Sequence, residues 1–387
     1  MSASGSASTS SAADARAPRT GCRIPIVWPD RRDPRLRLSA VIIALQILGQ
    51  VGLGFKVSIA QILVSIGVAA AIDGAITWRR ERVLAWPASA LLTGNSVAFI
   101  LRASGTRHGD WWSLHGVQYF ILAVILSLAS KHLIRIRGRH VFNPSNVGLL
   151  WTLLVIGPAR VFPQYLWWGP LETPLILALI VILAGAGWVL GSVRRVTTAL
   201  CFLAAFWALV GAFAAAGQSF IAIWHSGPVS GLAYWKDICL SPEIFVFVFF
   251  MMSDPRTAPS KRGEQLAYGA GTAALAAILL LPQPTEFGVK VAILASLTVT
   301  TALRRLAGAF SWHAELGAPG RGADRSPWSR GTDGSALLHR ALLALREPAI
   351  LAALLITIAA PTDTIALRGD RQIIYIERGL TGTRNPQ

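Results

Sequence analysis

The stretch "TPLILALIVILAGAGWVLGSVRRVTTALCFLAAFWALVGAF", from Thr173 to Phe213, holds two long apolar runs separated by a pair of arginines. A helix needs roughly 20 mostly apolar residues to cross a bilayer, so the stretch predicts two transmembrane helices joined by a short charged loop. The whole chain has this character, since 53% of its 387 residues are hydrophobic and only 14% are charged. Because so few polar residues could not cover the surface of a water-soluble domain, we expect an all-α, polytopic helical membrane protein.

Similar apolar windows recur from residue 39 onward, with short connections between them. They predict ten transmembrane helices in the cell membrane, at residues 39–55, 57–77, 83–101, 115–134, 145–160, 172–192, 197–217, 239–253, 265–282 and 286–303. An eleventh apolar segment, at 348–361, is short for a span. The predicted divisions are a disordered N-terminal tail (1–38), a transmembrane domain (39–305) and a polar Gly-, Pro- and Arg-rich C-terminal region (306–387) that contains this segment.

Lys and Arg are unevenly divided between the predicted loops. The loops on one side hold most of them, whereas the opposite loops hold only Lys56, Arg102, Arg107, Arg160 and Lys236. Because positive charge is retained on the cytoplasmic side, this alternation predicts a cytoplasmic N-terminus. The first residues lack the apolar core of a signal peptide, so we expect the first helix to direct insertion. Topology thus accounts for the net charge of +17, and the expected partner is the lipid bilayer, with no nucleic acid.

The chain carries no motif of a soluble enzyme. Cys22, Cys201 and Cys239 are far apart and show no CxxC spacing, which argues against a zinc site or an iron–sulfur cluster, so no metal is expected. The histidines are scattered, and GxSxG, HExxH, Walker A and GxGxxG patterns are absent. Polar or helix-breaking residues at membrane depth are therefore the candidates for function, because unsatisfied polar groups there are costly.

The first such stretch is "WPASALLTGNSVAF", Trp86 to Phe99. At helical spacing Ser89, Thr93 and Ser96 share one face and could line a cavity. Small-residue packing between helices explains the same pattern equally well.

The second stretch is "FNPSNVG", Phe142 to Gly148. Asn143 is a natural N-cap and Pro144 a natural first helical residue, so a helix is predicted to begin here. Free N–H groups at such a terminus attract anions, and basic residues lie just upstream. The alternative is an ordinary cap at a junction between loop and helix.

The third stretch is "FVFVFFMMSDPRTAPSKRGE", Phe245 to Glu264, in which an apolar run meets Asp254 and two prolines. A carboxylate at the edge of the bilayer needs a partner, and Arg256 offers one. Asp73 is the other acidic residue noted within a span. For it we expect an interfacial ion pair with Arg79 or Arg80.

Together the three stretches resemble the RnfD/NqrB family, membrane subunits of the Rnf and sodium-pumping NADH:quinone oxidoreductase complexes. The matching segments are "SALLTG" (Ser89 to Gly94), "FNPSNVG" and "MMSDPRTAPSKRGEQLAYG" (Met251 to Gly269), in the family's order. The resemblance covers roughly residues 39 to 305. It implies a bundle of two related halves, with flavin on an electron route and other redox subunits as partners.

The resemblance also implies a cofactor site, drawn from Ser89, Thr93, Gly94, Asn143, Pro144, Asp254 and Thr257. Family members of the electron-transport type attach FMN to a threonine in "SGAT", and that sequence is missing between the second and third stretches here. Covalent FMN is therefore not expected, and FMN or riboflavin would be bound non-covalently. The missing motif and the arginine-rich tail make the chain most similar in character to RnfD-like membrane proteins of enediyne biosynthesis.

Three functions stay open from the sequence. The first is a redox-linked membrane subunit that is not an independent enzyme. The second is a transporter or exporter of a small hydrophobic or anionic solute, since paired broken segments in two halves mark substrate sites in transporters. The third is a membrane scaffold that keeps the family fold and has lost its chemistry.

Overall fold

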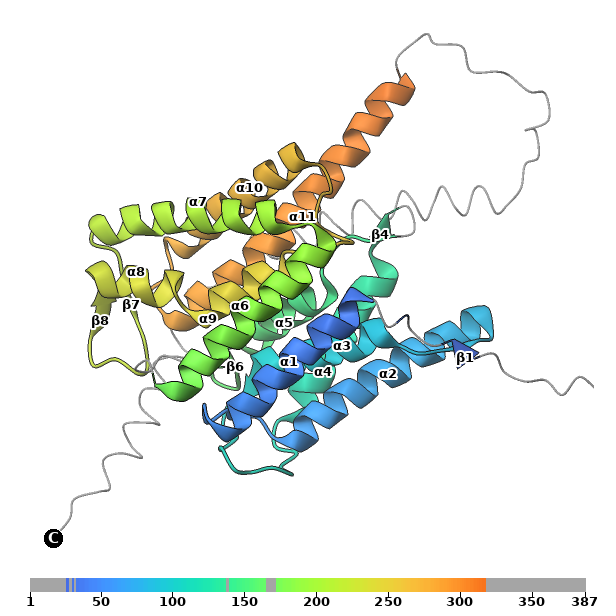
Figure 1. Ribbon diagram of the computed structural model, residues 1–387, viewed down its shortest axis with the longest axis horizontal. Helices are drawn as coiled ribbons and strands as arrows, with labels where there is room; N and C mark the ends of the chain where they lie inside the picture. The colour runs from blue at the N-terminus through green and yellow to red at the C-terminus, as the bar shows by residue number, and fades with distance from the viewer. Residues whose placement is uncertain (1–25, 28–29, 31–32, 137–138, 165–171, 318–387) are drawn as a thin grey trace, which may run out of the picture.

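The computed structural model describes residues 26–27, 30, 33–136, 139–164 and 172–317 (Figure 1). Most of the predicted N-terminal tail and the apolar segment at 348–361 lie outside the described residues.

Helices dominate the described chain. The long ones are α1 (Pro34–Val51), α2 (Ile59–Glu81), α3 (Ala88–Ile100), α4 (Val117–Leu133), α5 (Pro144–Ile156), α6 (Thr173–Val193), α7 (Val196–Ala215), α10 (Arg262–Leu280) and α11 (Glu286–Gly317). Each overlaps one predicted span, with boundaries that differ by up to five residues, and α11 continues well beyond its span at the C-terminal end. Five helices are long and apolar enough to cross a membrane, namely α1, α2, α6, α7 and the Glu286–Arg305 part of α11, and α3, α4 and α5 are shorter apolar helices. The all-α membrane class is thus confirmed, whereas the count of ten spans stays a prediction.

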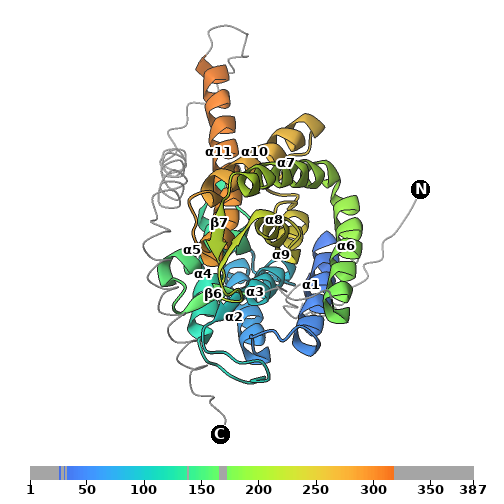
Figure 2. The same cartoon turned by 90° about the vertical axis from the view of Figure 1, so that its left-hand side faces the viewer.

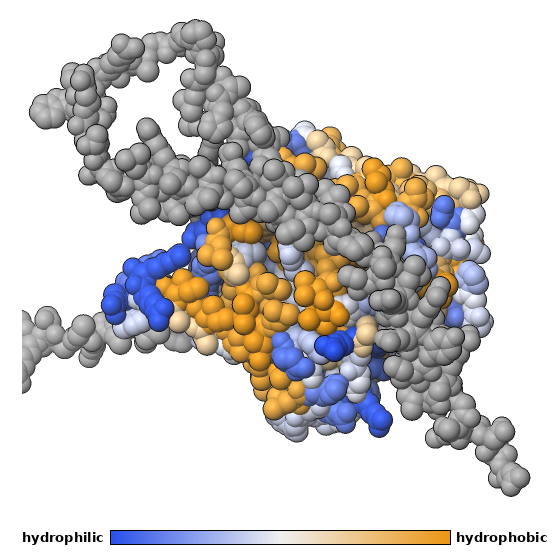
Figure 3. All heavy atoms as spheres, turned by 180° about the vertical axis from the view of Figure 1, so that it is seen from behind, coloured by the Kyte–Doolittle hydropathy of each residue, from blue (hydrophilic) through white to orange (hydrophobic). Residues whose placement is uncertain are grey.

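The surface agrees with a membrane environment. Apolar side chains gather across the face drawn in Figure 3, with hydrophilic residues toward its ends. Large apolar side chains on α6 are exposed, including Ile180 and Leu183 at 55% each. By contrast, most of the apolar window of α11 is buried, and this helix packs against α10 and α5.

The helices pack in pairs. α4 lies against α5, α10 against both α7 and α11, and α1 beside α6 (Figures 1 and 2). Glycines allow several of these close approaches: a Cβ added at Gly94 would lie 2.5 Å from the Ser65 carbonyl oxygen of α2, and one at Gly148 would overlap Ser127 of α4. Small residues at contacts are typical of helix packing in membranes.

The eighth predicted span, 239–253, is not one helix. It is divided into the end of α8 (Gly231–Cys239), α9 (Pro242–Val246) and a π-helical turn, η1 (Phe247–Met251). Ser241 caps α9, and Pro242 is its first residue. The helix stops after η1 because the residue four positions beyond Met251 is Pro255, which has no N–H to donate.

Short strand pairs close the ends of the bundle. β3 (Leu101–Ala103) pairs antiparallel with β6 (Val161–Pro163), and Arg102 lies opposite Phe162. The other pairs are β7 (Ser219–Ile221) with β8 (Pro228–Ser230), β4 (Arg135–Ile136) with β5 (Arg139–His140), and β1 (Ile26–Val27) with β2 (Leu84–Ala85).

Three local predictions were wrong. Residues 34–38 are helical, because Asp33 caps α1 and Pro34 begins it. The helix of the last span continues beyond residue 303 to Gly317. Asp73 pairs with Lys131 and His132 of α4, at 2.8 Å each, instead of with an arginine of its own helix. The packing of α2 on α4 brings these α4 residues within reach of a carboxylate that lies 8% exposed.

Candidate functional site

A cavity of about 300 Å³, here called the α5 cavity, lies at the N-terminal end of α5. Its walls come from α1, α3, α5, the end of α6, η1 and the turn that follows η1. The polar side chains that line it are Asp33, Arg35, Ser89, Thr93, Ser96, His140, Asn143, Ser145, Ser253, Asp254 and Arg256. Residues from all three polar stretches of the sequence therefore meet around one cavity.

The cavity gathers most of the predicted site residues. Those that line it are Ser89, Thr93, Asn143, Pro144 and Asp254. Gly94 does not, because it faces α2 at the close contact with Ser65, which is small-residue packing between helices. Thr257 does not either: it is fully buried beneath the turn, with its hydroxyl 3.4 Å from the Asp254 carboxylate and its carbonyl oxygen bonded to Arg304. Its place is to hold the Asp254 turn.

Asn143 joins two elements at the cavity. Its Oδ1 accepts hydrogen bonds from the backbone N–H of Asn146 at 3.4 Å and from the Ser145 hydroxyl at 3.0 Å, so the predicted N-cap is confirmed. Its Nδ2 donates to the Met251 carbonyl oxygen at 3.0 Å. That oxygen lacks a helical donor because Pro255 occupies the required position. Asn143 thus completes both the start of α5 and the end of η1.

Asp254 faces His140 across the cavity. The carboxylate accepts the Arg256 backbone amide at 3.1 Å and lies 3.6 Å from His140 Nε2. That separation is too long for a hydrogen bond. His140 is 6% exposed, and its Nε2 has no hydrogen-bond partner among the described residues. A buried ring nitrogen without a partner is costly, so this atom is open to a ligand. The predicted contact between Asp254 and Arg256 is thus made by the backbone of Arg256.

The helix α3 supplies the other polar wall. Ser89, Thr93 and Ser96 line the cavity together, as their helical spacing predicted. The Thr93 hydroxyl donates to the Ser89 carbonyl oxygen at 2.8 Å. For the Ser89 and Ser96 hydroxyls the described residues supply no hydrogen-bond partner. The apolar lining includes Leu38, Ile42, Leu92, Phe99, Val189 and Phe250. An apolar wall with a few convergent polar groups is typical of small-molecule sites.

Two arginines at the mouth of the cavity, Arg35 and Arg256, differ in whether a nearby carboxylate already pairs with them. Arg35 is paired with Asp33 at 2.5 Å, and its hydrogen bonds hold the pKa of the Asp33 carboxyl below its usual value. The exposed guanidinium of Arg256 makes no ion pair with any described residue. Arg256 is therefore the cation at this cavity that an anionic ligand would meet.

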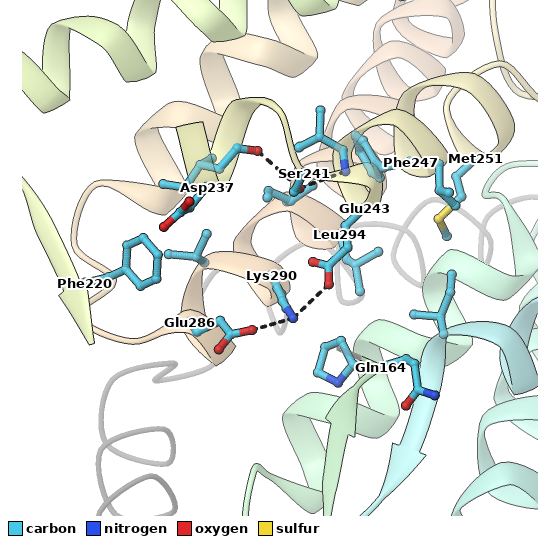
Figure 4. Close-up of a pocket in the computed structure, with 17 residues that line it drawn as sticks. Gln164, Phe220, Asp237, Ser241, Glu243, Phe247, Met251, Glu286, Lys290 and Leu294 are labelled. Atoms are coloured by element: carbon cyan, nitrogen blue, oxygen red, sulfur yellow. Dashed lines mark hydrogen bonds and ion pairs between the residues drawn. The ribbon is translucent and has the colours of Figure 1, made fainter. Parts of the chain in front are cut away.

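A second cavity, here called the α11 cavity, has a volume of about 70 Å³ and lies at the start of α11. In it, Lys290 Nζ lies 2.9 Å from a Glu243 carboxylate oxygen and 2.6 Å from one of Glu286 (Figure 4). None of these three residues was among the predicted site residues, although the i, i+4 spacing of Glu286 and Lys290 at the start of an apolar helix was a signal. Ile100, Val246 and Met251 line both cavities.

No family model and no curated protein sequence matches the chain. The RnfD/NqrB resemblance accordingly stays a prediction that rests on three motifs. In the part of the chain that the structure describes, no group of three or more His, Cys, Asp or Glu is placed to bind a metal ion.

Proposed function

We propose that this chain is a membrane subunit with a redox-linked role, whose α5 cavity holds FMN or riboflavin without a covalent bond. One observation carries the proposal. Residues from all three motifs that resemble those of the RnfD/NqrB family, although far apart in the sequence, line a single amphipathic cavity. The electron donor and acceptor would lie on partner subunits, as the resemblance implies, so the chain would not be an independent enzyme.

The residues of the cavity fit a flavin ring. Phe99 and Phe250 would pack against its apolar surface. Ser89, Ser96 and His140 would meet its heteroatom edge, because their side-chain hydrogen-bonding groups are open. The volume of about 300 Å³ is at the lower end of the usual range for ligand pockets, which suits one planar ring system better than a dinucleotide.

The mouth of the cavity fits the remainder of the molecule. The exposed Arg256 would bind a phosphate, so it favours FMN over riboflavin. A bound flavin would supply one- and two-electron transfer. Asn143 and Thr257 would fix the shape of the walls, and His140 Nε2 would hold or accept a proton at the ring edge. The Arg256 guanidinium and His140 Nε2 suit these roles because, among the described residues, the first makes no ion pair and the second has no hydrogen-bond partner.

The absorption spectrum of the purified protein in detergent tests the proposal. We expect flavin absorbance near one equivalent, either as purified or after incubation with FMN. A preparation without flavin that takes up neither FMN nor riboflavin would reject it.

Transport is the second candidate, and the α11 cavity is the observation that favours it. The packing of α4 on α5 is repeated by α10 on α11, and α2 against α4 by α7 against α10, which supports two related halves. Each of the paired helices α5 and α11 begins at one of the two cavities. Broken segments at corresponding places in two halves are a feature of transporters. Deletion of the protein with unchanged efflux of solutes but altered redox behaviour would reject transport.

A further inference from the structure

The α11 cavity buries a lysine between two carboxylates. The side chains of Lys290, Glu243 and Glu286 are 7%, 17% and 3% exposed. Figure 4 shows the ammonium group between the two glutamates, which come from α9 and α11. Charged groups at membrane depth are expensive, and in membrane proteins they mark ion pathways and proton relays. An ion pair that serves only to join two helices needs one carboxylate, whereas this one has two.

A third carboxylate stands on the same lining. Asp237 of α8 borders the cavity, and within the described residues it has no ion-pair partner. Burial raises the pKa of the Asp237 carboxyl, with His225 and Lys236 acting in the opposite direction. Arg102 lies 5.7 Å from the ring of Phe162, and Lys290 Nζ lies 5.6 Å from the same ring. These are the charged groups that face the cluster from the surrounding elements.

An unpartnered amide shows that the cavity is polar enough for water. Gln164, at 2% exposure, lines the cavity, and neither its Nε2 nor its Oε1 has a hydrogen-bond partner among the residues described. Buried polar groups without a protein partner are usually satisfied by ordered water. A volume of about 70 Å³ accommodates several water molecules and no ring system.

We propose that the α11 cavity is a proton-exchange site, in which the carboxylates around Lys290 take up and release one proton through water beside Gln164. Uptake transfers a proton from a hydronium ion to a carboxylate oxygen, which forms one O–H bond and leaves neutral water; release is the reverse. A proton suits this site better than a metal ion, because no described group of carboxylates has metal-binding geometry.

The site lies at the start of α11, next to the α5 cavity. Glu286 begins α11, and Arg304, eighteen residues further along the helix, hydrogen-bonds to Thr257 below the α5 cavity. Eighteen residues of helix extend about 27 Å, close to the thickness of the hydrocarbon core. The two cavities thus lie toward opposite ends of the bundle, with the shared residues Ile100, Val246 and Met251 between them. The proton site stands whether or not a flavin occupies the α5 cavity.

Infrared spectroscopy of the full chain in lipid membranes tests the proposal. We expect a carbonyl band of a protonated carboxylic acid that titrates with pH and shifts in D₂O. In Glu286→Gln the titration midpoint should fall by about one pH unit or more, because one negative charge is lost. In Lys290→Met it should rise by a similar amount, because the neutralising ammonium is lost. Glu264→Gln, at an exposed pair on α10, is the matched control and should leave the midpoint unchanged.

Two results would overturn the proposal. The first is the absence of such a band from the unmodified protein throughout the pH range in which it stays folded, which would mean that the carboxylates form fixed ion pairs. This result does not depend on whether the variants fold. If Na⁺ in place of choline lowers the midpoint, the site binds a metal cation. Flavin absorbance measured on the same samples keeps this test separate from that of the α5 cavity.

Discussion

Replacing Asn143 by alanine should destabilise the protein through two separate losses. The first is the cap of α5, which costs about 1 kcal/mol in a typical helix. The second is the bond from Nδ2 to the Met251 carbonyl oxygen, 3.0 Å long. An orphaned buried carbonyl costs about 1–3 kcal/mol, so Asn143→Ala should lower the free energy of unfolding by about 2–4 kcal/mol.

Asn143→Ser separates the two losses. Serine is a good N-cap and is too short to reach Met251, so only the carbonyl penalty of about 1–3 kcal/mol should remain. The assay is unfolding by SDS in mixed micelles, followed by the fluorescence of the 14 tryptophans. If the alanine and serine variants both lose less than about 0.5 kcal/mol, the link from α5 to the π-helical turn contributes nothing, and the reasoning is refuted.

The remaining predictions concern packing, ion pairs and pH. Gly148→Ala should lower the free energy of unfolding by about 1–3 kcal/mol, because the added Cβ would overlap α4. Gly67→Ala meets only open space and should stabilise α2 by up to about 1 kcal/mol. Equal effects of the two variants on the thermal midpoint would contradict the close contact between α4 and α5. Asp73→Asn should lower the free energy of unfolding by about 3 kcal/mol, because it leaves the buried Lys131 unpaired. Glu264→Gln, in an exposed pair, should lower it by about 0.5 kcal/mol or less. Comparable losses in SDS unfolding would count against the buried pair. The pKa of Asp33 is lowered in the folded state, so its stabilisation is present above the usual value of 3.8 and is lost as the pH falls below it. The difference in the free energy of unfolding between the unmodified protein and Asp33→Asn should therefore shrink on acidification. A difference that stays constant with pH would contradict a stabilising pair of Asp33 with Arg35.

The helices could be predicted from the sequence because apolar runs of membrane length leave few alternatives. The run that includes Thr173–Val193 has no polar interruption, and its boundaries were predicted to within a residue or so. The run at 239–253 looked similarly continuous, yet it is divided at Ser241 and ends in a π-helical turn. Hydropathy does not register a cap and a proline within an apolar window, so this division was missed.

The candidate site was predictable to the extent that it follows helical geometry. The common face of Ser89, Thr93 and Ser96 and the cap at Asn143 depend only on spacing and local preference. The partners of Asn143 and Asp73 lie on other helices, at Met251 and Lys131, and no local rule gives them. Tertiary packing therefore decides which polar residues face a cavity and which face a neighbouring helix.

The α11 cavity shows a different limit. Glu243 and Glu286 are separated by more than 40 positions and meet only because α9 packs near the start of α11. In the sequence Glu243 lies within one predicted span and Glu286 at the start of another, and nothing local relates them. Only the fold shows that one lysine serves both.

A scaffold without chemistry remains distinguishable from a working subunit. Alanine at Asn143, Asp254 and Thr257 should abolish function if the α5 cavity acts in it. Function that survives all three substitutions, with normal expression, would favour the scaffold.

Titration of the purified protein with FMN and riboflavin, followed by quenching of flavin fluorescence, tests the central claim most directly. We predict saturation near one equivalent, weaker binding of riboflavin than of FMN, and loss of binding in Ser96→Phe, which fills the α5 cavity, but not in Leu63→Phe on the exposed face of α2. Absence of saturable binding, or binding that Ser96→Phe leaves unchanged, would contradict the assignment of the α5 cavity as a flavin site.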